Sequence, residues 1–316
     1  MLRLLVLAGV LLVCAEAAAG TPPSPSLKPD RPFASKVVST QDAGLLHAAL
    51  DAADAGDWSR VARYEARAGD PVVRDLILWR RAHVGAPGLY FDDMADAIER
   101  LEAWPDTYRM RARAEDLITS SSLGAQARVD WLTANGGPVT GEGHVALADA
   151  RRALGDTDGA KAALHAAWRG MTLDRDTERK VLGKYGDWLS QDDHRARADF
   201  LLWTGQRSAA NRLKPRLTAD WQRLVEARIA LAAGYRGVDA RIAAVPEDLQ
   251  AHPGLLFDRA QWRRKRGRQD SATPLLTGID GANVPESGRN RLWDERHIAL
   301  RDALEEKSYA TAYSLA

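Results

Sequence analysis

Apolar and polar positions in residues 145–169 follow the period of two α-helices joined by a tight turn. The first helix carries a mostly apolar stripe with helical spacing: Leu147, Ala150, Arg151 and Leu154. The second helix carries a stripe of small and apolar residues: Ala160, Ala163, Leu164 and Ala167. Gly155 suits a left-handed helix end, and Asp156 or Asp158 suits the following N-cap. Since helices this short are unstable alone in water, the pattern predicts neighbours that cover both stripes.

Helical patterning of this kind continues along most of the chain, and no run shows the sustained alternation of a strand. Pro71 suits the first turn of a helix, whereas Pro105 and Pro138 suit stops. We expect helices from near Gln41, after Asp57 and from Pro71, and over residues 91–104, 106–118, 122–134, 173–189, 192–203, 207–213, 219–233, 238–244, 255–266, 269–276, 291–305 and 309–316.

The hairpin recurs at unequal intervals. Five turn residues mark its copies: Gly56, Gly155, Gly205, Gly267 and Lys307. Five positions after each turn lies a small or medium apolar residue: Val61, Ala160, Ala210, Ala272 and Ala312. Eight positions after each turn lies a larger or apolar residue: Tyr64, Ala163, Leu213, Leu275 and Leu315. This pattern predicts an all-α fold, an irregular α-solenoid or superhelix of stacked hairpins similar to tetratricopeptide repeats.

The N-terminus has the pattern of a cleavable signal peptide, residues 1–19. A short positive segment precedes the apolar run Leu4–Val13, and small residues suited to signal peptidase follow it. The run is shorter than the roughly 20 residues that span a bilayer, so we expect no membrane span. Val13 before Cys14 disfavours a lipoprotein, and cleavage leaves a chain without cysteine. The sequence therefore predicts export, a proline-rich linker over residues 20–40 and a superhelical domain over residues 41–316.

Composition narrows the classes of partner. The 44 basic and 43 acidic side chains give a formal charge of +1, so no overall field attracts nucleic acid. Ten tryptophans occur about once per hairpin. They are expected to wedge between stacked helices, and the alternative is that a few line a sugar-binding groove.

No motif in the chain indicates catalysis, a metal or a cofactor. No two of the seven histidines lie three or four residues apart, and neither G-x-S-x-G nor a phosphate-binding loop occurs. The densest cluster of potential metal ligands, Asp192, Asp193 and His194, fits a helix N-terminus better than a metal site. We therefore predict no catalytic residue, no metal site and no cofactor.

A basic run near residue 260 is the strongest candidate for binding. Arg259, Trp262, Arg263 and Arg266 share one face of a predicted helix. Guanidinium groups pair well with carboxylates, so these four residues are the predicted contacts for an anionic glycan or peptide. The alternative is a solvated outer face with Trp262 in the core of the hairpin.

Three stretches in the second half resemble soluble lytic murein transglycosylases. Residues 188–213 contain a motif of the form R-x-D-x-L-L-W: Arg197, Asp199, Leu201, Leu202 and Trp203. Residues 253–264, followed by Gly267, resemble a helix pair of that family. The most specific stretch combines these residues: Trp293, Glu295, Arg296, Ala299, Arg301, Ala303, Leu304, Glu305 and residues 309–313. The likeness covers residues 185–316 well and the earlier half only in style.

The resemblance implies that the chain is related to periplasmic bacterial enzymes, which cleave the glycan strand of peptidoglycan and leave 1,6-anhydromuramyl ends. In that family a U- or ring-shaped superhelix carries a lysozyme-like domain with a catalytic Glu-Ser pair and a Gly-Leu-Met-Gln motif. In this chain the single Glu-Ser, Glu286-Ser287, is expected in a loop before the last family-like stretch, and Gly-Leu-Met-Gln is missing. No catalytic residue is therefore carried over.

We expect the superhelical part of such an enzyme, incomplete at its C-terminus within the second helix of the last hairpin. It would lie in the periplasm and hold glycan strands, with other cell-wall proteins as further partners. The alternative is an exported helical-repeat adaptor that binds protein partners on its concave face.

Overall fold

The computed structural model describes residues 38–316, so the predicted signal peptide and most of the predicted linker lie outside the described residues. Within residues 38–316 the chain forms eighteen α-helices and four short 3-10 helices, without any strand. The predicted all-α solenoid is therefore confirmed. None of the helices in this range has the length and apolar character needed to cross a membrane.

The helix bounds follow the predicted order closely. The α-helices are α1 (Thr40–Asp54), α2 (Trp58–Arg67), α3 (Pro71–Val84), α4 (Phe91–Arg100), α5 (Thr107–Ile118), α6 (Ala125–Thr133), α7 (Gly141–Ala153), α8 (Thr157–Gly170), α9 (Arg175–Tyr185), α10 (Gln191–Trp203), α11 (Arg207–Leu213), α12 (Ala219–Ala233), α13 (Val238–Ala243), α14 (Glu247–Gln250), α15 (Pro253–Arg264), α16 (Gln269–Thr277), α17 (Glu286–Glu305) and α18 (Tyr309–Leu315). The 3-10 helices are η1 (Ala134–Gly136), η2 (Gly186–Trp188), η3 (Lys214–Arg216) and η4 (Gly281–Asn283).

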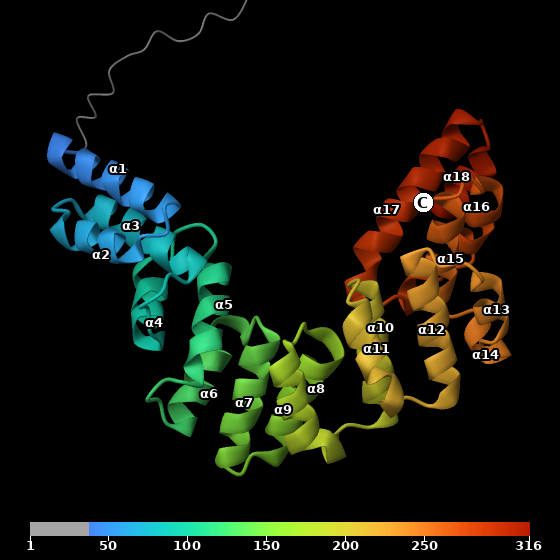
Figure 1. Cartoon of the computed structure of the whole chain (residues 1–316), viewed down its shortest axis with the longest axis horizontal. Coiled ribbons are helices and arrows are strands. Elements are labelled where there is room, and N and C mark those ends of the chain that lie inside the picture. The colour runs from blue at the N-terminus through green and yellow to red at the C-terminus, as the bar shows by residue number, and fades with distance from the viewer. Residues whose placement is uncertain (1–37) are drawn as a thin grey trace, which may run out of the picture.

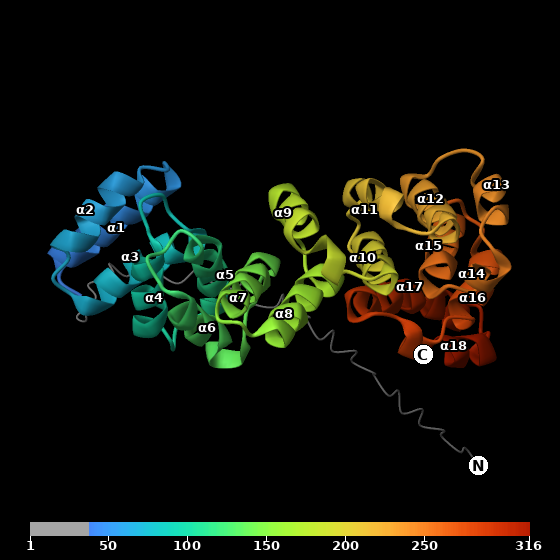
Figure 2. The same cartoon turned by 90° about the horizontal axis from the view of Figure 1, so that it is seen from below.

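The helices form an open, U-shaped arch (Figure 1). Helices α1–α4 make one side, α5–α9 the base, and α10–α18 the other side. Seen from below, the helices up to α12 follow one another roughly along the length of the molecule, and α17 returns to lie beside α10 (Figure 2). Each hairpin packs mainly on its neighbours in the chain, as expected for a solenoid.

All five predicted hairpin turns share one backbone geometry. Each turn residue has a positive φ, from 60° at Lys307 to 82° at Gly155. In each case the next residue donates its N–H to the carbonyl five positions earlier, as between Asp156 and Arg151 at 3.0 Å or Ser308 and Ala303 at 2.8 Å. This bond satisfies a free carbonyl at the helix end, and glycine adopts the required φ without strain. The turns are therefore determined locally.

The residues five positions after these turns are all buried: Val61, Ala160, Ala210, Ala272 and Ala312. Of the residues eight positions after the turns, Ala163, Leu213 and Leu315 are buried, and Tyr64 and Leu275 are half-buried. Asp156, rather than Asp158, caps α8 by accepting from Gly159 N at 2.9 Å. The repeat pattern is confirmed.

The stripe predicted for α7 is wrong in part. Leu147 and Ala150 are buried, but Leu154 is 47% exposed and ends the helix at the surface. Instead, α7 buries Val145, Ala146 and Ala148 as well. It contacts α5, α6 and α8, so its apolar positions cover several sides instead of a single stripe.

Nine of the ten tryptophans pack in or against the hydrophobic cores, as the wedge interpretation predicts. Trp168 and Trp203 are fully buried, and seven others lie partly buried against core clusters: Trp58, Trp79, Trp104, Trp131, Trp188, Trp221 and Trp262. Trp293 is the exception, with 56% of its surface exposed.

Several helix ends differ from the predictions. The last long helix, α17, begins at Glu286 rather than Arg291, so Glu286-Ser287 lies in a helical first turn and not in a loop. Pro285 precedes the helix with an extended backbone, and Glu286 is favoured there by the helix dipole. Helix α4 ends at Arg100, before the predicted Trp104, and the short α14 was not predicted.

On the C-terminal side of the arch, α17 packs against α10, although the two helices are far apart in the sequence. Trp203 at the end of α10 packs on Phe257 of α15, with ring centroids 4.8 Å apart. Gly288 of α17 lies so close to Trp203 that an added Cβ would be 2.6 Å from the indole. Arg291 then donates to the carbonyl of Trp203 at 2.7 Å. Helices α10, α15 and α17 therefore form one packed unit.

Candidate functional site

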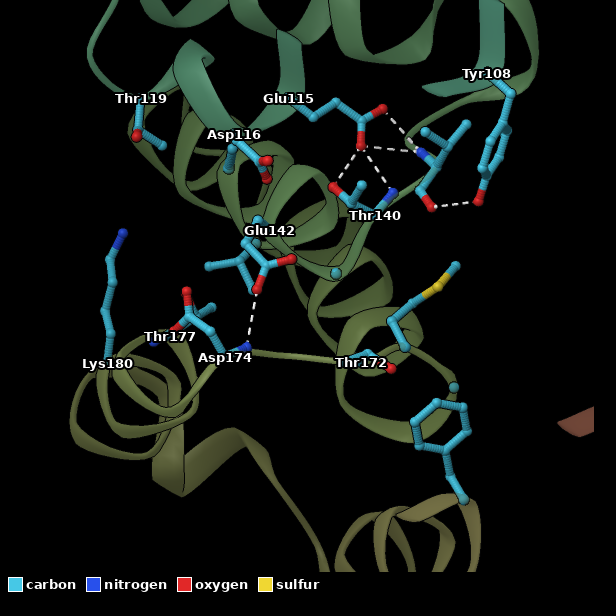
Figure 3. Close-up of a pocket in the computed structure, with 17 residues that line it drawn as sticks. Tyr108, Glu115, Asp116, Thr119, Thr140, Glu142, Thr172, Asp174, Thr177 and Lys180 are labelled. Carbon is cyan, nitrogen blue, oxygen red and sulfur yellow. Dashed lines mark hydrogen bonds between the residues drawn. The ribbon is translucent and has the colours of Figure 1, made fainter. Parts of the chain in front are cut away.

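A cavity of about 790 Å³ lies at the base of the arch. It opens between the C-terminal half of α5, the start of α7, the end of α8 and the start of α9 (Figure 3). Carboxylates and hydroxyl groups dominate the polar lining: Tyr108, Glu115, Asp116, Thr119, Thr140, Glu142, Thr172, Asp174 and Thr177. Apolar atoms come from Val145, Met171 and Phe200, among others. Its volume is within the range of small-molecule sites.

Glu115 fixes one wall of this cavity. Its buried carboxylate accepts hydrogen bonds from Val139 N at 2.8 Å, Thr140 N at 2.8 Å and Thr140 Oγ1 at 2.6 Å (Figure 3). Arg111 Nε lies 3.4 Å from the same carboxylate. Gly143 packs directly against Glu115, where an added Cβ would overlap Oε2. Because Glu115 is fully engaged, it anchors the start of α7 and is not free for a ligand.

Three further carboxylates are less enclosed. Glu142 accepts from Asp174 N at 3.0 Å, and Asp174 caps α9 by accepting from Thr177 N at 2.6 Å. Asp116 is half-exposed, and Figure 3 shows it beside Glu142 in the same space. Burial raises the pKa of Asp116, and the neighbouring carboxylate of Glu142 raises it further against the opposing charge of Arg113. The cavity is therefore strongly acidic.

Lys180 at the rim does not neutralise this charge, because its ammonium pairs with Asp149 at 2.9 Å. Tyr108 presents a ring that is 63% exposed, while its hydroxyl donates to Val139 O at 3.2 Å. The cavity thus combines an exposed aromatic face with carboxylate and hydroxyl acceptors. This combination suits a ligand that is rich in O–H and N–H donors.

Sequence reasoning did not find this cavity. Glu142 and Asp174 had the pattern of acidic residues at helix starts, and Glu115 and Asp116 that of an ordinary helix surface. The only local indication was the pair of small residues Gly141 and Gly143, which precede the predicted helix beginning at Val145 and in the structure form the first turn of α7. Gly141 is required by close contact with the carbonyl of Thr172, which the Cβ of any larger residue would overlap.

The predicted binding residues lie elsewhere, on α15 and just after it. Arg259, Trp262 and Arg263 line one small cavity of about 170 Å³ between α13, α14 and α15. Arg266 stays outside it and stacks over the Trp262 ring, 4.0 Å from the centroid, while donating to Gly234 O at 3.2 Å. The structure therefore brings three of the four residues together at a cavity, and Arg266 covers one face of the indole.

Trp262 also packs against the core cluster of α12, α13 and α15, as the alternative interpretation expected. Both roles apply to the same side chain, since Trp262 packs against this core and also lines the cavity. No tryptophan among the described residues lines the larger cavity at the base of the arch.

The candidate metal ligands 192–194 form a helix N-terminus, as predicted. Ser190 is the N-cap, and Asp193 completes a capping box and pairs with Arg169 at 2.5 Å. His194 packs edge-on against Trp168. Across residues 38–316 no three potential ligands are grouped so that they could hold a metal ion.

Residues of the three family-like stretches make buried contacts between helices. Arg197 donates to the carbonyls of Trp168 and Met171 at the end of α8. Glu295 of α17 binds Arg264 of α15, with Arg264 Nη2 3.0 Å from Oε2.

Arg228 and Arg296 make the remaining contacts between helices. Arg228 of α12 bridges Asp199 of α10 at 2.5 Å and Asp258 of α15 at 2.7 Å. Arg296 donates to the carbonyls of Leu276 and Ile279 at the end of α16. These contacts account for the charged side chains that are buried between the helices.

Comparison with known proteins returned no match, either to any protein-family model or to any curated protein sequence.

Proposed function

We propose that this chain is the periplasmic α-superhelical scaffold of a soluble lytic transglycosylase, and that it holds glycan strands of peptidoglycan. Residues 1–316 do not carry the motifs of the lysozyme-like catalytic domain, because Gly-Leu-Met-Gln is missing and Glu286-Ser287 lies in a scaffold helix. The proposal includes export through the predicted signal peptide.

The observation that carries the proposal is the mutual contact of the three family-like stretches. Asp199 in the first and Asp258 in the second share Arg228, and Trp203 in the first packs on Phe257 in the second. Arg264 in the second pairs with Glu295 in the third. Three likenesses that are separate in sequence thus belong to one packing unit, which supports a shared scaffold.

The cavity at the base of the arch supports glycan as the ligand. Sugar hydroxyl and acetamido N–H groups are donors, and Asp116, Glu142 and the threonine hydroxyls offer acceptors. The exposed ring of Tyr108 provides a flat apolar surface against which a sugar ring can pack.

Cosedimentation of the purified protein with peptidoglycan sacculi tests the proposal. We expect binding without release of anhydro-muropeptides. Tyr108→Ala should weaken binding by about 3- to 10-fold, the loss expected for one aromatic contact of about 0.5–1.5 kcal/mol. Tyr313→Ala is the matched control, because Tyr313 is 88% exposed and far along the chain from the cavity; it should bind like the wild type.

Two outcomes would contradict the proposal. Release of anhydro-muropeptides by the chain alone would show catalysis that the scaffold lacks. Failure to bind sacculi, combined with capture of one stoichiometric protein partner, would favour the exported adaptor instead.

A further inference from the structure

The small cavity between α13, α14 and α15 has the chemistry of an anion site. It lies at the outer edge of the C-terminal side of the arch, away from the base (Figure 1). Arg259, Trp262 and Arg263 come from α15, and Asp239 and Gln250 face them from α13 and α14. Ile242, Ala243 and Leu231 supply apolar walls.

Two residues that line this cavity each carry a buried hydrogen-bond donor without a partner. Arg259 Nε and Trp262 Nε1 are both buried and make no hydrogen bond to any residue in the range 38–316. A buried donor without an acceptor costs about 1–3 kcal/mol, so such donors indicate a missing acceptor. Unpaired donors also occur on other side chains of the described chain, for example Trp203 Nε1, but Trp203 does not line this cavity.

Three neighbouring arginines already have partners, unlike Arg259. Arg263 donates to Ser271 O at 2.8 Å, Arg264 pairs with Glu295, and Arg266 donates to Gly234 O. Gln250 uses its amide N–H groups on the carbonyls of Ile242 and Val245. Within the described chain, Arg259 thus brings a guanidinium that no carbonyl or carboxylate accepts from.

The charge of the lining is positive, since Arg259 and Arg263 face the single carboxylate of Asp239. Burial lowers the pKa of Arg259, the charge of Arg263 lowers it further, and Asp239 opposes both effects. An entering anion would relieve this repulsion. The cavity volume of about 170 Å³ is below that of ordinary small-molecule sites, so it accommodates a single small group rather than a whole sugar.

We propose that this cavity binds the carboxylate of a small ligand group, with Arg259 and the Trp262 indole N–H as its donors. Guanidinium and indole donors both suit a carboxylate oxygen, and a charge-assisted bond to the guanidinium supplies most of the affinity. The group can be the carboxylate of a sugar acid or that of a peptide C-terminus. The site is separate from the cavity at the base of the arch, so either proposal can fail alone.

The test follows the indole N–H resonance of Trp262 by NMR in the full-length mature protein, with Trp262→Phe used to assign it. N-acetylmuramic acid and N-acetylalanine are the two carboxylate probes. N-acetylglucosamine and N-acetylalaninamide are their controls without a carboxylate. We expect saturable shifts of the Trp262 resonance with one or both acids and none with the neutral controls, and the responding acid identifies the source of the carboxylate.

Three variants sharpen the result. Arg259→Gln should weaken binding by at least about tenfold, because it removes a charge-assisted hydrogen bond. Asp239→Asn should tighten binding, because it removes the opposing carboxylate. Arg289→Gln, at an exposed position of α17, is the matched control and should bind like the wild type. Unchanged resonances of the other tryptophans verify that each variant is folded.

Equal shifts with acids and neutral controls would overturn the proposal, as would an unchanged affinity in folded Arg259→Gln. Sacculus binding is measured in parallel. A protein that binds sacculi but none of the carboxylate probes retains the proposed function and loses this site. A protein that binds an acid through Arg259 but no sacculi retains the site and loses the proposed function.

Discussion

Arg228 is fully buried, and its guanidinium lies where three helices meet. Asp199 and Asp258 accept from it, and Gly254 allows its approach, since an added Cβ would overlap Cζ. Buried ion pairs contribute little net stability, because desolvation offsets their attraction, but a directional cluster disfavours alternative packings of the same helices. We therefore attribute to these residues the register of α10, α12 and α15.

His252 lies beside this cluster and makes the stability of the protein depend on pH. The pKa of His252 is lowered to about 4, mainly by burial and in smaller part by the charge of Arg228, against the opposing charge of Asp199. In the unfolded chain histidine titrates near 6.5, so between about pH 6.5 and 4 the unfolded state binds more protons. We expect the neutral form to stabilise the fold fully above about pH 6.5, with up to about 3 kcal/mol lost by pH 4.

His252→Asn tests this, because asparagine can still cap α15 as His252 Nδ1 does by accepting from Gly254 N at 3.1 Å. Denaturant unfolding between about pH 4 and 7 should show a smaller loss of unfolding free energy in this variant than in the wild type. Identical pH profiles would show that His252 is not responsible.

At the scale of elements, the molecule uses one hairpin design several times. A left-handed turn residue, a hydrogen bond back over five residues and a buried small residue five positions on recur in the five hairpins. Gly85 and Gly234 repeat the same turn, but longer connections follow them, and the next helix starts at Phe91 or Val238. The turns are therefore uniform, and the longer connections contribute to the irregular spacing of the hairpins along the chain.

Glycines in helices differ sharply in what they contact, and this predicts opposite effects of alanine. Gly288→Ala should lower the free energy of unfolding by about 1–3 kcal/mol, because its methyl group would overlap the buried Trp203 ring. Gly183→Ala, at an exposed position of α9 with nothing within 4 Å of the added Cβ, should raise it by about 0.5–1 kcal/mol. Denaturant titrations of both variants measure the difference.

Stabilisation by Gly288→Ala would mean that α17 does not pack on α10 through Trp203. The Gly183→Ala variant guards against a general effect of removing glycine from a helix, since both changes reduce the entropy of the unfolded chain equally.

At the scale of the whole molecule, the core is divided. One cluster runs from Ala82 to Val225 through the base of the arch, whereas α1–α3 bury a separate cluster that includes Leu45 and Ile77. Two more clusters lie in the C-terminal side. In a solenoid each unit depends mainly on its neighbours, so units at an end have fewer stabilising interfaces.

Native-state hydrogen exchange should therefore show at least about tenfold lower protection in α1 and α2 than in α7 and α8. The expected order follows from the single interface of the first hairpin against the several interfaces of α7. Mass spectrometry of peptides covering residues 40–67 and 141–170 measures it. Equal protection in both segments would indicate one cooperative unit.

The sequence by itself determined the helices, the turns and the class of fold. These depend on local causes: apolar spacing, proline, and glycine at positions of positive φ with hydrogen bonds inside one turn. It also placed Arg259, Trp262 and Arg263 on one helix face, because residues three and four apart share a face. It was wrong about Leu154, because the sides that a central helix buries are chosen by its neighbours.

Only the tertiary structure decided where the cavities lie and which side chains face one another across them. Asp116, Glu142 and Asp174 come from different segments of the chain and meet at the base of the arch, and Asp239 approaches Arg259 from another helix. Their proximity depends on the angles at which hairpins stack. Those angles result from the packing of whole side-chain surfaces, such as Gly288 against Trp203, and not from any local pattern in the chain.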